Sequence, residues 1–587
     1  RNRTGEGTQR SADPQRLSEM KFGATYLGNH RARFRLWAPG QNKISLEIDG
    51  RSTAMTPQPE GWFETETEAA PGESYPYRLE SGQAVPDPAS RSQAEDVHGP
   101  SLVVDPNAYS WRHSEWQGRP WHETVLYELH AGTCGGFAGV QVDLDRLAGL
   151  GITAIELMPI NDFPGTRNWG YDGALPFAPD RSYGTPDELK TLIDAAHERG
   201  LMVFLDVVYN HFGPDGNYLG LYAPHFFRQD MKTPWGIAID FRQQQVRRFF
   251  IENALYWLTE YRFDGLRLDA VHAIADQTWL AEMAAEVRRT VEKGRQIHLV
   301  LEHDGNEADH LRRGYDAQWN DDAHHVLHVL LTGEGDGYYG DYAQAPARQL
   351  ARALAEGFIF QGDPSPYRKG EKRGTLSADL PPTAFVLFLQ NHDQIGNRPF
   401  GDRLTTIADP EVLRAAITLQ LLSPNIPLVF MGEERMSRTP FQFFTDYHGE
   451  LADAVREGRR REFASFTRFG GKNIPDPNAR ETFERSRVTL TGDDSLYRAL
   501  LNLRHDTIVP RLPGARTLDS QVLGPAAVLA RWRMGDGAIL AMAANLGPEP
   551  AAIASPGGRL LFATSDKAIA GGMLAVHSTA VFLEPAP

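Results

Sequence analysis

Three carboxylates that lie far apart in the chain each stand at the end of an apolar run. Asp269 ends "FDGLRLD", Glu302 ends "HLVLE" and Asp393 ends "AFVLFLQNHD". Where such runs form neighbouring parallel strands, their carboxyl ends meet on one side of the fold. Glycoside hydrolysis needs one ionised carboxylate that attacks and one protonated carboxyl that assists the leaving oxygen. Further negative charge stabilises the oxocarbenium-like transition state. The three residues therefore indicate a candidate site for this chemistry.

The segment "FDGLRLDAVHAI" places charge within an apolar run. In a strand, Leu266 and Leu268 point to one face, and Arg267 and Asp269 then point to the other. Burying either charge alone is costly, so the two must serve each other or a ligand. We expect Arg267 to keep Asp269 ionised as the nucleophile. Glu302 has no cation beside it in the sequence, as suits a proton donor. A plain structural ion pair is the alternative, and this segment alone does not decide between them.

Eight apolar runs separated by helical stretches must position these residues. Between the second and third runs, Thr185 and Pro186 offer a helix N-cap and a first helical residue. The alternation predicts an α/β fold, a parallel (β/α)8 TIM barrel over residues 108–509, with loop insertions after "DVVYNH" and "WNDD". The runs are "TVLYELHAG", "AIELMPI", "LMVFLDVVYNH", "FDGLRLD", "HLVLEHD", "YDAQW", "AFVLFLQNHD" and "PLVFMGEE".

Short alternating runs broken by turn residues precede and follow the barrel. Residues 21–107 predict an N-terminal β-sandwich, with strands at "RFRLWAP", "ISLEID" and "YPYRLE". Residues 510–587 predict a C-terminal antiparallel β domain, also of the sandwich type, with strands at "AAVLARWRM", "AILAMAANL" and "STAVFLEP". Residues 1–20 are polar, and we expect them to be disordered.

Composition excludes several classes of partner. The 587 residues include 60 Lys+Arg and 76 Asp+Glu, a formal charge of -16, which argues against nucleic-acid binding. No run of eighteen apolar residues occurs, so no segment is expected to span a membrane. Cys134 is the only cysteine, so no intramolecular disulfide is possible, and "GTCGGF" indicates a small loop residue. We expect a cytoplasmic monomer or homodimer.

The segments "DVVYNH", "GLRLDAVHA", "LEHD" and "QNHD" resemble the four short motifs of glycoside hydrolase family 13, the α-amylase family. The resemblance covers almost the whole chain, including both β domains. It implies a retaining mechanism with Asp269 as nucleophile, Glu302 as general acid/base and Asp393 as stabiliser of the transition state. The two catalytic carboxyls should then lie roughly 5–5.5 Å apart. Because water completes the reaction, no cofactor is implied.

Further segments resemble those members of the family that act on maltooligosyltrehalose. They imply hydrolysis of the α-1,4 linkage next to the terminal trehalose, which releases trehalose and a maltooligosaccharide. At one position the chain departs from these members, because His303 follows Glu302 where they carry Asn, and we expect it to tune the proton affinity of Glu302. The segments include "GTRNWGYDG", "YNHFGPDGNYLGLYAPHFF", "YDAQWNDDAHHVLHVLLTGE", "LQNHDQIGNR" and "FQFFTDYHGEL".

Two alternatives stay open at this point. One is a glycogen branching or debranching enzyme of the same family, which shares the fold and the carboxylates. The products released from maltotriosyltrehalose and from plain maltooligosaccharides would distinguish it. The other is a catalytically silent glucan-binding protein, against which the presence of all three carboxylates argues.

Substrate contacts are expected from polar and aromatic residues around the same strand ends. The resemblance assigns Asp206, His211, Arg267 and His392 to the subsite of the attacked glucose, where both histidines could donate hydrogen bonds to sugar hydroxyls. Tyr171 is expected to stack on a sugar ring. The other expected substrate-binding residues are His272 and, from "WNDD" and "FFTDYHG", Trp319, Asp322 and Asp446.

Two further clusters have simpler interpretations. His324, His325 and His328 lie at helical spacing, but the surrounding sequence is not rich in carboxylates, so we expect them to line a helix near the cleft rather than hold a metal. Some relatives bind calcium, but no ligand cluster is evident here, and we expect no metal. A basic cluster next to Glu457 and Glu462 is interpreted as a solvated helix face; it comprises Arg456, Arg459, Arg460 and Arg461.

Overall fold

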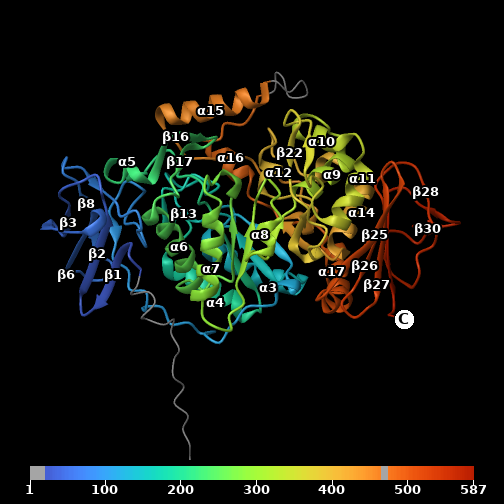
Figure 1. Cartoon of the computed structure of the whole chain (residues 1–587), viewed down its shortest axis with the longest axis horizontal. Helices are drawn as coiled ribbons and strands as arrows, with labels where there is room; N and C mark the ends of the chain where they lie inside the picture. The colour runs from blue at the N-terminus through green and yellow to red at the C-terminus, as the bar shows by residue number, and fades with distance from the viewer. Residues whose placement is uncertain (1–19, 465–472, 587) are drawn as a thin grey trace, which may run out of the picture.

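The computed structural model describes residues 20–464 and 473–586. The disorder expected for residues 1–20 falls outside this range except at Met20, which is buried. Three parts lie side by side in Figure 1, with the N-terminal sheets at one end, the barrel in the centre and the C-terminal sheets at the other end. The boundaries 21–107, 108–509 and 510–587 stay predictions.

A closed barrel of eight parallel strands forms the central part, and this confirms the predicted fold class. Each of the eight predicted runs contributes one strand. Every neighbouring pair is parallel, including the first and last strands, which close the barrel. In order around the barrel the strands are β11 (Leu126–Leu129), β12 (Ala154–Leu157), β15 (Met202–Val207), β18 (Gly265–Leu268), β19 (His298–Leu301), β20 (Ala317–Trp319), β23 (Phe385–Phe388) and β24 (Ile426–Phe430).

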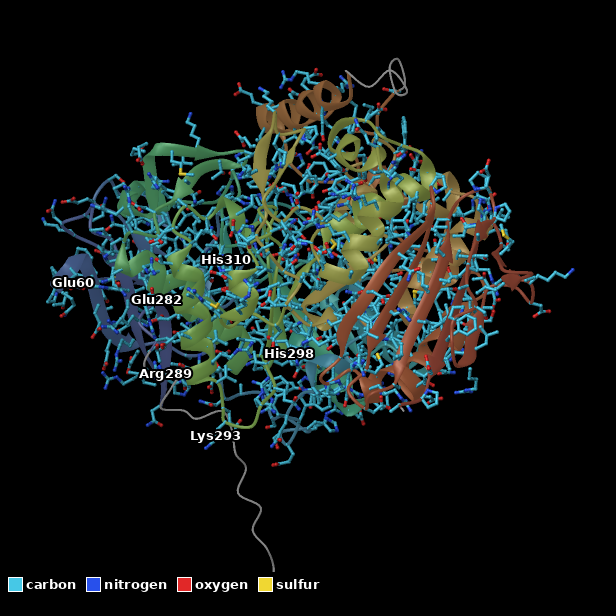
Figure 2. All side chains as sticks on the ribbon, turned by 45° about the vertical axis from the view of Figure 1, so that its right-hand side comes forward. Glu60, Glu282, Arg289, Lys293, His298 and His310 are labelled. Carbon is cyan, nitrogen blue, oxygen red and sulfur yellow. The ribbon has the colours of Figure 1, made fainter. Side chains whose placement is uncertain are left out.

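Apolar side chains fill the barrel below its mouth. Phe204, Val300, Phe388 and Leu428 are all fully buried and belong to one cluster inside it. Figure 2 shows Lys293 and His298, which precede and begin β19, below His310, which follows that strand. The C-terminal ends of the strands therefore face the upper part of that view.

Helices surround the barrel and bury their apolar faces against it. In α4, Thr185 caps the helix as expected: its side chain accepts from the backbone of Glu188, and the Glu188 side chain accepts from the backbone of Thr185. In α6, Phe249, Phe250 and Trp257 lie on the buried face. The longer helices are α2 (Gly136–Val142), α3 (Leu144–Leu150), α4 (Pro186–Glu198), α6 (Gln244–Thr259), α7 (Thr278–Thr290), α9 (Asp321–Thr332), α11 (Pro346–Glu356), α14 (Pro410–Leu422), α15 (Gly449–Ala464), α16 (Arg480–Arg485) and α17 (Ser495–Leu503).

Two four-stranded antiparallel sheets form the N-terminal part. Phe34 of one sheet packs edge-on against Tyr75 beside the other, with ring centroids 4.8 Å apart. The Glu252 carboxylate on α6 accepts hydrogen bonds from the backbone N–H groups of Lys21 and Phe22, which fixes this part to the barrel. The strands are β1 (Gly23–Gly28), β2 (Arg31–Trp37), β6 (Trp62–Glu68) and β5 (Thr56–Gln58) in one sheet, and β4 (Arg51–Ala54), β3 (Ser45–Ile48), β8 (Tyr77–Arg78) and β9 (Ala84–Val85) in the other.

A five-stranded and a three-stranded antiparallel sheet form the C-terminal part. The larger sheet packs against α11 and α14, where Thr579 donates to the carbonyl of Ala415 and Trp532 to that of Leu354. The strands are β25 (Arg516–Gly524), β26 (Ala527–Arg533), β27 (Ile539–Asn545), β32 (Ser578–Glu584) and β29 (Arg559–Ala563), then β28 (Ala551–Ala552), β31 (Met573–Leu574) and β30 (Ile569–Ala570).

Insertions rise from the barrel where the sequence predicted them. After β15, β16 (Phe227–Thr233) and β17 (Gly236–Ile239) form a hairpin, and after β20, β21 (Asp363–Ser365) and β22 (Glu371–Arg373) form another. Helix α15 lies along the upper edge of the molecule in Figure 1. Among the described helices, none combines the length and the apolar character that crossing a membrane requires.

Candidate active site

Arg267 stands at the centre of a group of carboxylates at the barrel mouth. Its side chain is fully buried. Its Nη1 donates to Asp206 Oδ2 at 2.7 Å and to Asp269 Oδ1 at 2.8 Å, and its Nη2 lies 2.8 Å from Glu302 Oε2. The guanidinium also lies over the Trp319 ring, 4.1 Å from its centroid. Asp206 lies on β15, and Asp269 and Glu302 directly follow β18 and β19. Carboxylates from three barrel strands therefore contact one cation.

This arrangement corrects one expectation. Glu302 has no cation beside it in the sequence, yet Arg267 lies against it in space. Burial still raises the pKa of the Glu302 carboxyl, and the negative charge of Asp269 adds to this, while Arg267 acts in the opposite direction. Burial prevails because the whole group is shielded from water. Glu302 therefore has the raised proton affinity of a general acid even though it contacts a guanidinium.

A strained turn after Asp269 helps to hold Glu302. Ala270 has φ 40° and ψ 47°, a left-handed conformation that costs a residue with a Cβ roughly 1 kcal/mol or more. The Ala270 N–H donates to Glu302 Oε2 at 2.9 Å, and the next N–H, that of Val271, donates to the Glu302 carbonyl at 3.0 Å. The strain is thus tied to the relative placement of the two carboxyls.

Asn210 completes the surroundings of Asp269 and was not among the predicted site residues. Its Nδ2 donates to Asp269 Oδ2 and to the Asp269 carbonyl, both at 2.9 Å. His211 in turn lies against Asn210 Oδ1 through Nδ1 and 2.9 Å from the Tyr171 carbonyl through Nε2. Both ring nitrogens of His211 therefore have protein partners, and the ring orients Asn210. The signal for Asn210 was its place beside His211 in "YNH".

Asp393 is the most exposed of the three carboxylates, with 33% of its side chain accessible. His392 Nε2 lies 3.4 Å from its Oδ1, and His392 Nδ1 lies 2.5 Å from Glu128 Oε1. Burial opposes a charge on His392, but Asp393 and Glu128 outweigh it and raise the pKa of His392 to about 9. Burial also raises the pKa of Asp393. His392 is thus a buried cation between two carboxylates, and both of its nitrogens are engaged within the protein.

Aromatic side chains border the pocket. The Tyr171 hydroxyl donates to Asp206 Oδ2 at 2.6 Å, and its ring stacks on His392 at 5.0 Å, so one face of Tyr171 is already covered. Trp235, in the turn between β16 and β17, is 47% exposed and stacks on His211 with centroids 5.5 Å apart. Nothing in "TPWG" predicted this position, because only the folded hairpin brings Trp235 to the site.

Two expected substrate contacts are corrected by their burial. Trp319 is 1% exposed and lies beneath Arg267 inside the barrel. Asp322 is fully buried, accepts from the backbone N–H groups of Ile359 and Phe360, and pairs with Arg373 at 2.8 Å. Neither side chain can reach a sugar in this structure. Both instead support the walls of the site.

Asp446 and His272, two other expected contacts, have partners in neighbouring loops. Asp446 joins two loops, accepting from the N–H of Thr166 at 2.8 Å and pairing with Arg167. His272 is exposed and accepts from the Asp304 N–H through Nδ1 at 3.3 Å. His303 does not supply charge to Glu302, because burial lowers the pKa of its imidazole to about 3. His303 therefore does not tune Glu302 through a positive charge.

Two buried carboxylates in the barrel were also missed. Glu128 accepts from the backbone N–H and the ring of His392. Glu156 is 1% exposed, and neither of its carboxyl oxygens has a hydrogen-bond partner. Burial raises the pKa of Glu156 far above its ordinary range, and the charges of Glu128 and Asp206 act in the same direction. The signal for both was the same as for Arg267, a charged residue inside a buried strand.

The histidine and basic clusters do not belong to the group of carboxylates around Arg267. His324, His325 and His328 lie on α9, and no group of three or more His, Cys, Asp and Glu side chains suited to a metal occurs among the described residues. Arg459 is buried and donates to the carbonyl of Gly396, so the interpretation of a fully solvated helix face is wrong at this residue. Burial raises the pKa of the Cys134 thiol to about 12, as expected for a residue that is not a nucleophile.

Comparison with known proteins gives consistent matches. Residues 109–223 match the family model of the α-amylase catalytic domain, and residues 515–582 match a domain of unknown function, DUF3459. The chain is 41% identical over 514 residues to a malto-oligosyltrehalose trehalohydrolase of Deinococcus radiodurans, spanning 84% of this chain and 85% of that protein. It is 40% identical over 505 residues to the protein of the same name from Saccharolobus solfataricus, spanning 83% and 87%.

A solved structure extends this likeness to three dimensions. The crystal structure of a proposed α-amylase from Salmonella typhimurium shares 45% sequence identity with the chain and superposes with a TM-score of 0.91. The match spans 96% of this chain and 99% of that one. The barrel and both sets of flanking sheets therefore have a counterpart in one known structure.

Proposed function

Because the chain belongs to the malto-oligosyltrehalose trehalohydrolases of the α-amylase family, we propose that Asp269, Glu302 and Asp393 are its catalytic residues. The protein is a glycoside hydrolase that releases trehalose from maltooligosyltrehalose. The observation that carries the assignment is Arg267, whose two terminal nitrogens lie 2.8 Å from a carboxyl oxygen of Asp269 and of Glu302. One buried cation thereby fixes the nucleophile beside the acid.

The proposed reaction runs in two steps at the glucose next to trehalose. Glu302 gives its proton to the linking oxygen while Asp269 attacks the anomeric carbon, so that trehalose leaves and a glucosyl ester forms on Asp269. Water then attacks the same carbon, Glu302 takes a proton from it, and Asp269 is released. The raised pKa of Glu302 favours the protonated form that the first step needs. Asp393 adds negative charge where the oxocarbenium-like transition state forms.

The remaining charged residues are proposed to position this pair. Asn210 and Arg267 each donate to one carboxyl oxygen of Asp269. The orientation of the attacking carboxylate is thereby fixed. His392 holds Asp393, and Glu128 holds His392 from below. Tyr171 and Trp235 line the approach, and we propose that their accessible faces meet the sugar rings. The branching or debranching alternative is not favoured.

Product analysis tests the proposal directly. Purified protein is incubated with maltotriosyltrehalose and, separately, with maltopentaose, and the products are separated by chromatography. We expect trehalose and maltotriose from the first substrate and much slower turnover of the second. New α-1,6 branches, or equal rates on both substrates, would favour the alternative enzyme and sink the assignment of the trehalose linkage.

Substitutions test the residue roles separately. Asp269→Ala should lower kcat by roughly 10⁴-fold or more, because no nucleophile remains, while the protein still binds its substrate. Glu302→Gln should lose acid catalysis but retain activity on a trehalose-free substrate with a good leaving group, such as an activated aryl maltoside. If the wild-type protein binds glucan and releases nothing, the silent glucan-binding alternative is correct.

We further propose a cytoplasmic enzyme that works as a monomer or homodimer. Cys134 is its only cysteine, so its fold does not depend on an oxidising compartment. Light scattering of the purified protein should give the chain mass of 65.4 kDa or twice that value. A larger assembly would contradict the proposal.

A further inference from the structure

A second cavity, of about 640 Å³, lies at the rim of the barrel. Its walls are the start of α14, the turn after β24, and residues 489–496, which lead into α17. Helix α14 follows the seventh barrel strand, and the turn follows the eighth. In barrels of this class the loops after these two strands often form a phosphate-binding site. None of the residues that hold the catalytic carboxylates lines this cavity.

The outer wall is fixed by close backbone contact. Gly492 has φ +146°, and a Cβ there would lie 2.1 Å from the carbonyl oxygen of Arg435. The Gly492 carbonyl accepts from Arg435 Nη1 at 2.8 Å, and Asp494 pairs with Arg435 Nη2 at 3.2 Å. Residues 489–496 therefore lie tightly against the turn after β24. This contact therefore defines one wall of the cavity.

Two arginines line the cavity without a carboxylate partner. Arg414 on α14 is half-buried and Arg438 in the turn is exposed, and neither forms an ion pair within the described part of the chain. Glu411 lies one turn before Arg414 on α14 but does not pair with it. The other acid, Asp493, already accepts from the backbone and hydroxyl of Ser495. Arg414 and Arg438 are therefore the two lining cations that have no carboxylate partner among the described residues, while Glu411 and Asp493 balance their charge.

The rest of the lining suits a small hydroxylated anion. Five residues with hydroxyl side chains line the cavity, and no aromatic residue does, which argues against a site built for stacking a glucan chain. A phosphate accepts strong charge-assisted hydrogen bonds from arginine. The volume exceeds what one inorganic ion would fill and lies in the range of sites for small molecules. The hydroxyls are those of Ser437, Thr439, Thr489, Thr491 and Ser495.

We propose that this cavity binds a phosphorylated monosaccharide, with Arg414 and Arg438 on the phosphate and the hydroxyl side chains around the sugar. The start of α14 is not the binding group, because Asp409 already accepts from the N–H groups of Glu411 and Val412. The site is separate from the catalytic pocket, so its occupant is not the hydrolysed substrate.

Calorimetric titration of the full chain tests the proposal with glucose 6-phosphate, inorganic phosphate and glucose as probes. We expect glucose 6-phosphate to bind more tightly than phosphate, and glucose not to bind this site. Arg414→Gln and Arg438→Gln should each weaken glucose 6-phosphate binding by about tenfold or more. The matched control is Arg533→Gln, which removes an exposed arginine of the C-terminal sheet that likewise has no ion pair among the described residues.

The outcomes separate clearly. Unchanged trehalose release by the two cavity variants would show that they fold and that the effect is confined to the second site. The proposal is overturned if neither phosphate probe binds at about 10 mM, or if both cavity variants bind glucose 6-phosphate as tightly as the control. Equal binding of glucose would also overturn it, because the site would then recognise a neutral sugar.

Discussion

Replacing Arg267 with Lys keeps one positive charge at the barrel mouth but removes the planar fork that holds three carboxylates. Nη1 donates to Asp206 and Asp269 while Nη2 faces Glu302, all within 2.8 Å. A lysine ammonium is a point charge on a flexible stem and cannot reproduce this geometry. We expect Asp269 and Glu302 to lose their fixed relative placement.

The size of the effect follows from the contacts. Loss of two of the three charge-assisted contacts, at roughly 1.5–3 kcal/mol each, gives about 3–6 kcal/mol. If half of this is felt in the transition state, kcat/KM falls by roughly 10- to 150-fold. The other half lowers the free energy of unfolding, and we expect a lower melting temperature. Arg262→Lys is the matched control, because Arg262 is also buried but lies away from the site and donates to the backbone of Ser114 and Trp116.

The pH dependence gives an independent readout. The charge of Arg267 lowers the pKa of Glu302 against the effect of burial. In Arg267→Met this charge is gone, so the basic limb of the kcat/KM profile, where Glu302 loses its proton, should move to higher pH. Initial rates on maltotriosyltrehalose between pH 5 and pH 10 measure it. A limb that stays in place or moves to lower pH, or an Arg267→Lys variant as active as the Arg262→Lys control, would refute the reasoning.

Three further predictions concern the surroundings of this group. Because the pKa of His392 is raised from 6.5 to about 9, its stabilising contribution is complete below about pH 6.5 and is lost as the pH rises through about 9; the melting temperature of His392→Gln should therefore fall less than that of wild type over this window. Trp235→Ala removes the ring stacked on His211, and should raise KM for maltotriosyltrehalose by about 2- to 10-fold; an unchanged KM would exclude Trp235 from substrate binding. Glu156→Gln should change kcat and melting temperature little, because burial raises the pKa of Glu156 and so favours its neutral carboxyl; a large loss of activity would mean that Glu156 works as an anion.

The barrel was predictable because each of its strands is a short apolar run bounded by polar residues. Such runs are buried on both faces in a parallel sheet, and their carboxyl ends carry the functional side chains. The runs ending at Asp269, Glu302 and Asp393 therefore located both the fold and the candidate site. The flanking sheets were predictable from alternating runs and turn residues, as at "RFRLWAP", which forms β2.

The features of the site that could not be predicted depend on contacts between segments that lie far apart in the sequence. The approach of Arg267 to Glu302 joins two strands, and the stacking of Trp235 on His211 needs a folded hairpin. The burial of Trp319 could not be seen, because a tryptophan at a strand end can point into the barrel or into the pocket. Only the folded barrel decides this direction.

The charge balance at the barrel mouth explains why a protonated acid can sit against a guanidinium. Asp206, Asp269 and Glu302 all lie within 2.8 Å of Arg267, so three carboxyls share one positive charge. Burying two uncompensated negative charges is costly, so the group as a whole takes up protons. Burial accordingly raises the pKa of Asp206 to about 7, despite Arg267, and raises that of Glu302. Asp269 accepts from Asn210 as well as from Arg267, and Glu302 accepts from the Ala270 N–H beside its contact with Arg267. Because each carboxyl has one such additional donor, the raised proton affinity of Glu302 follows from its burial within a group of three carboxyls that share a single cation.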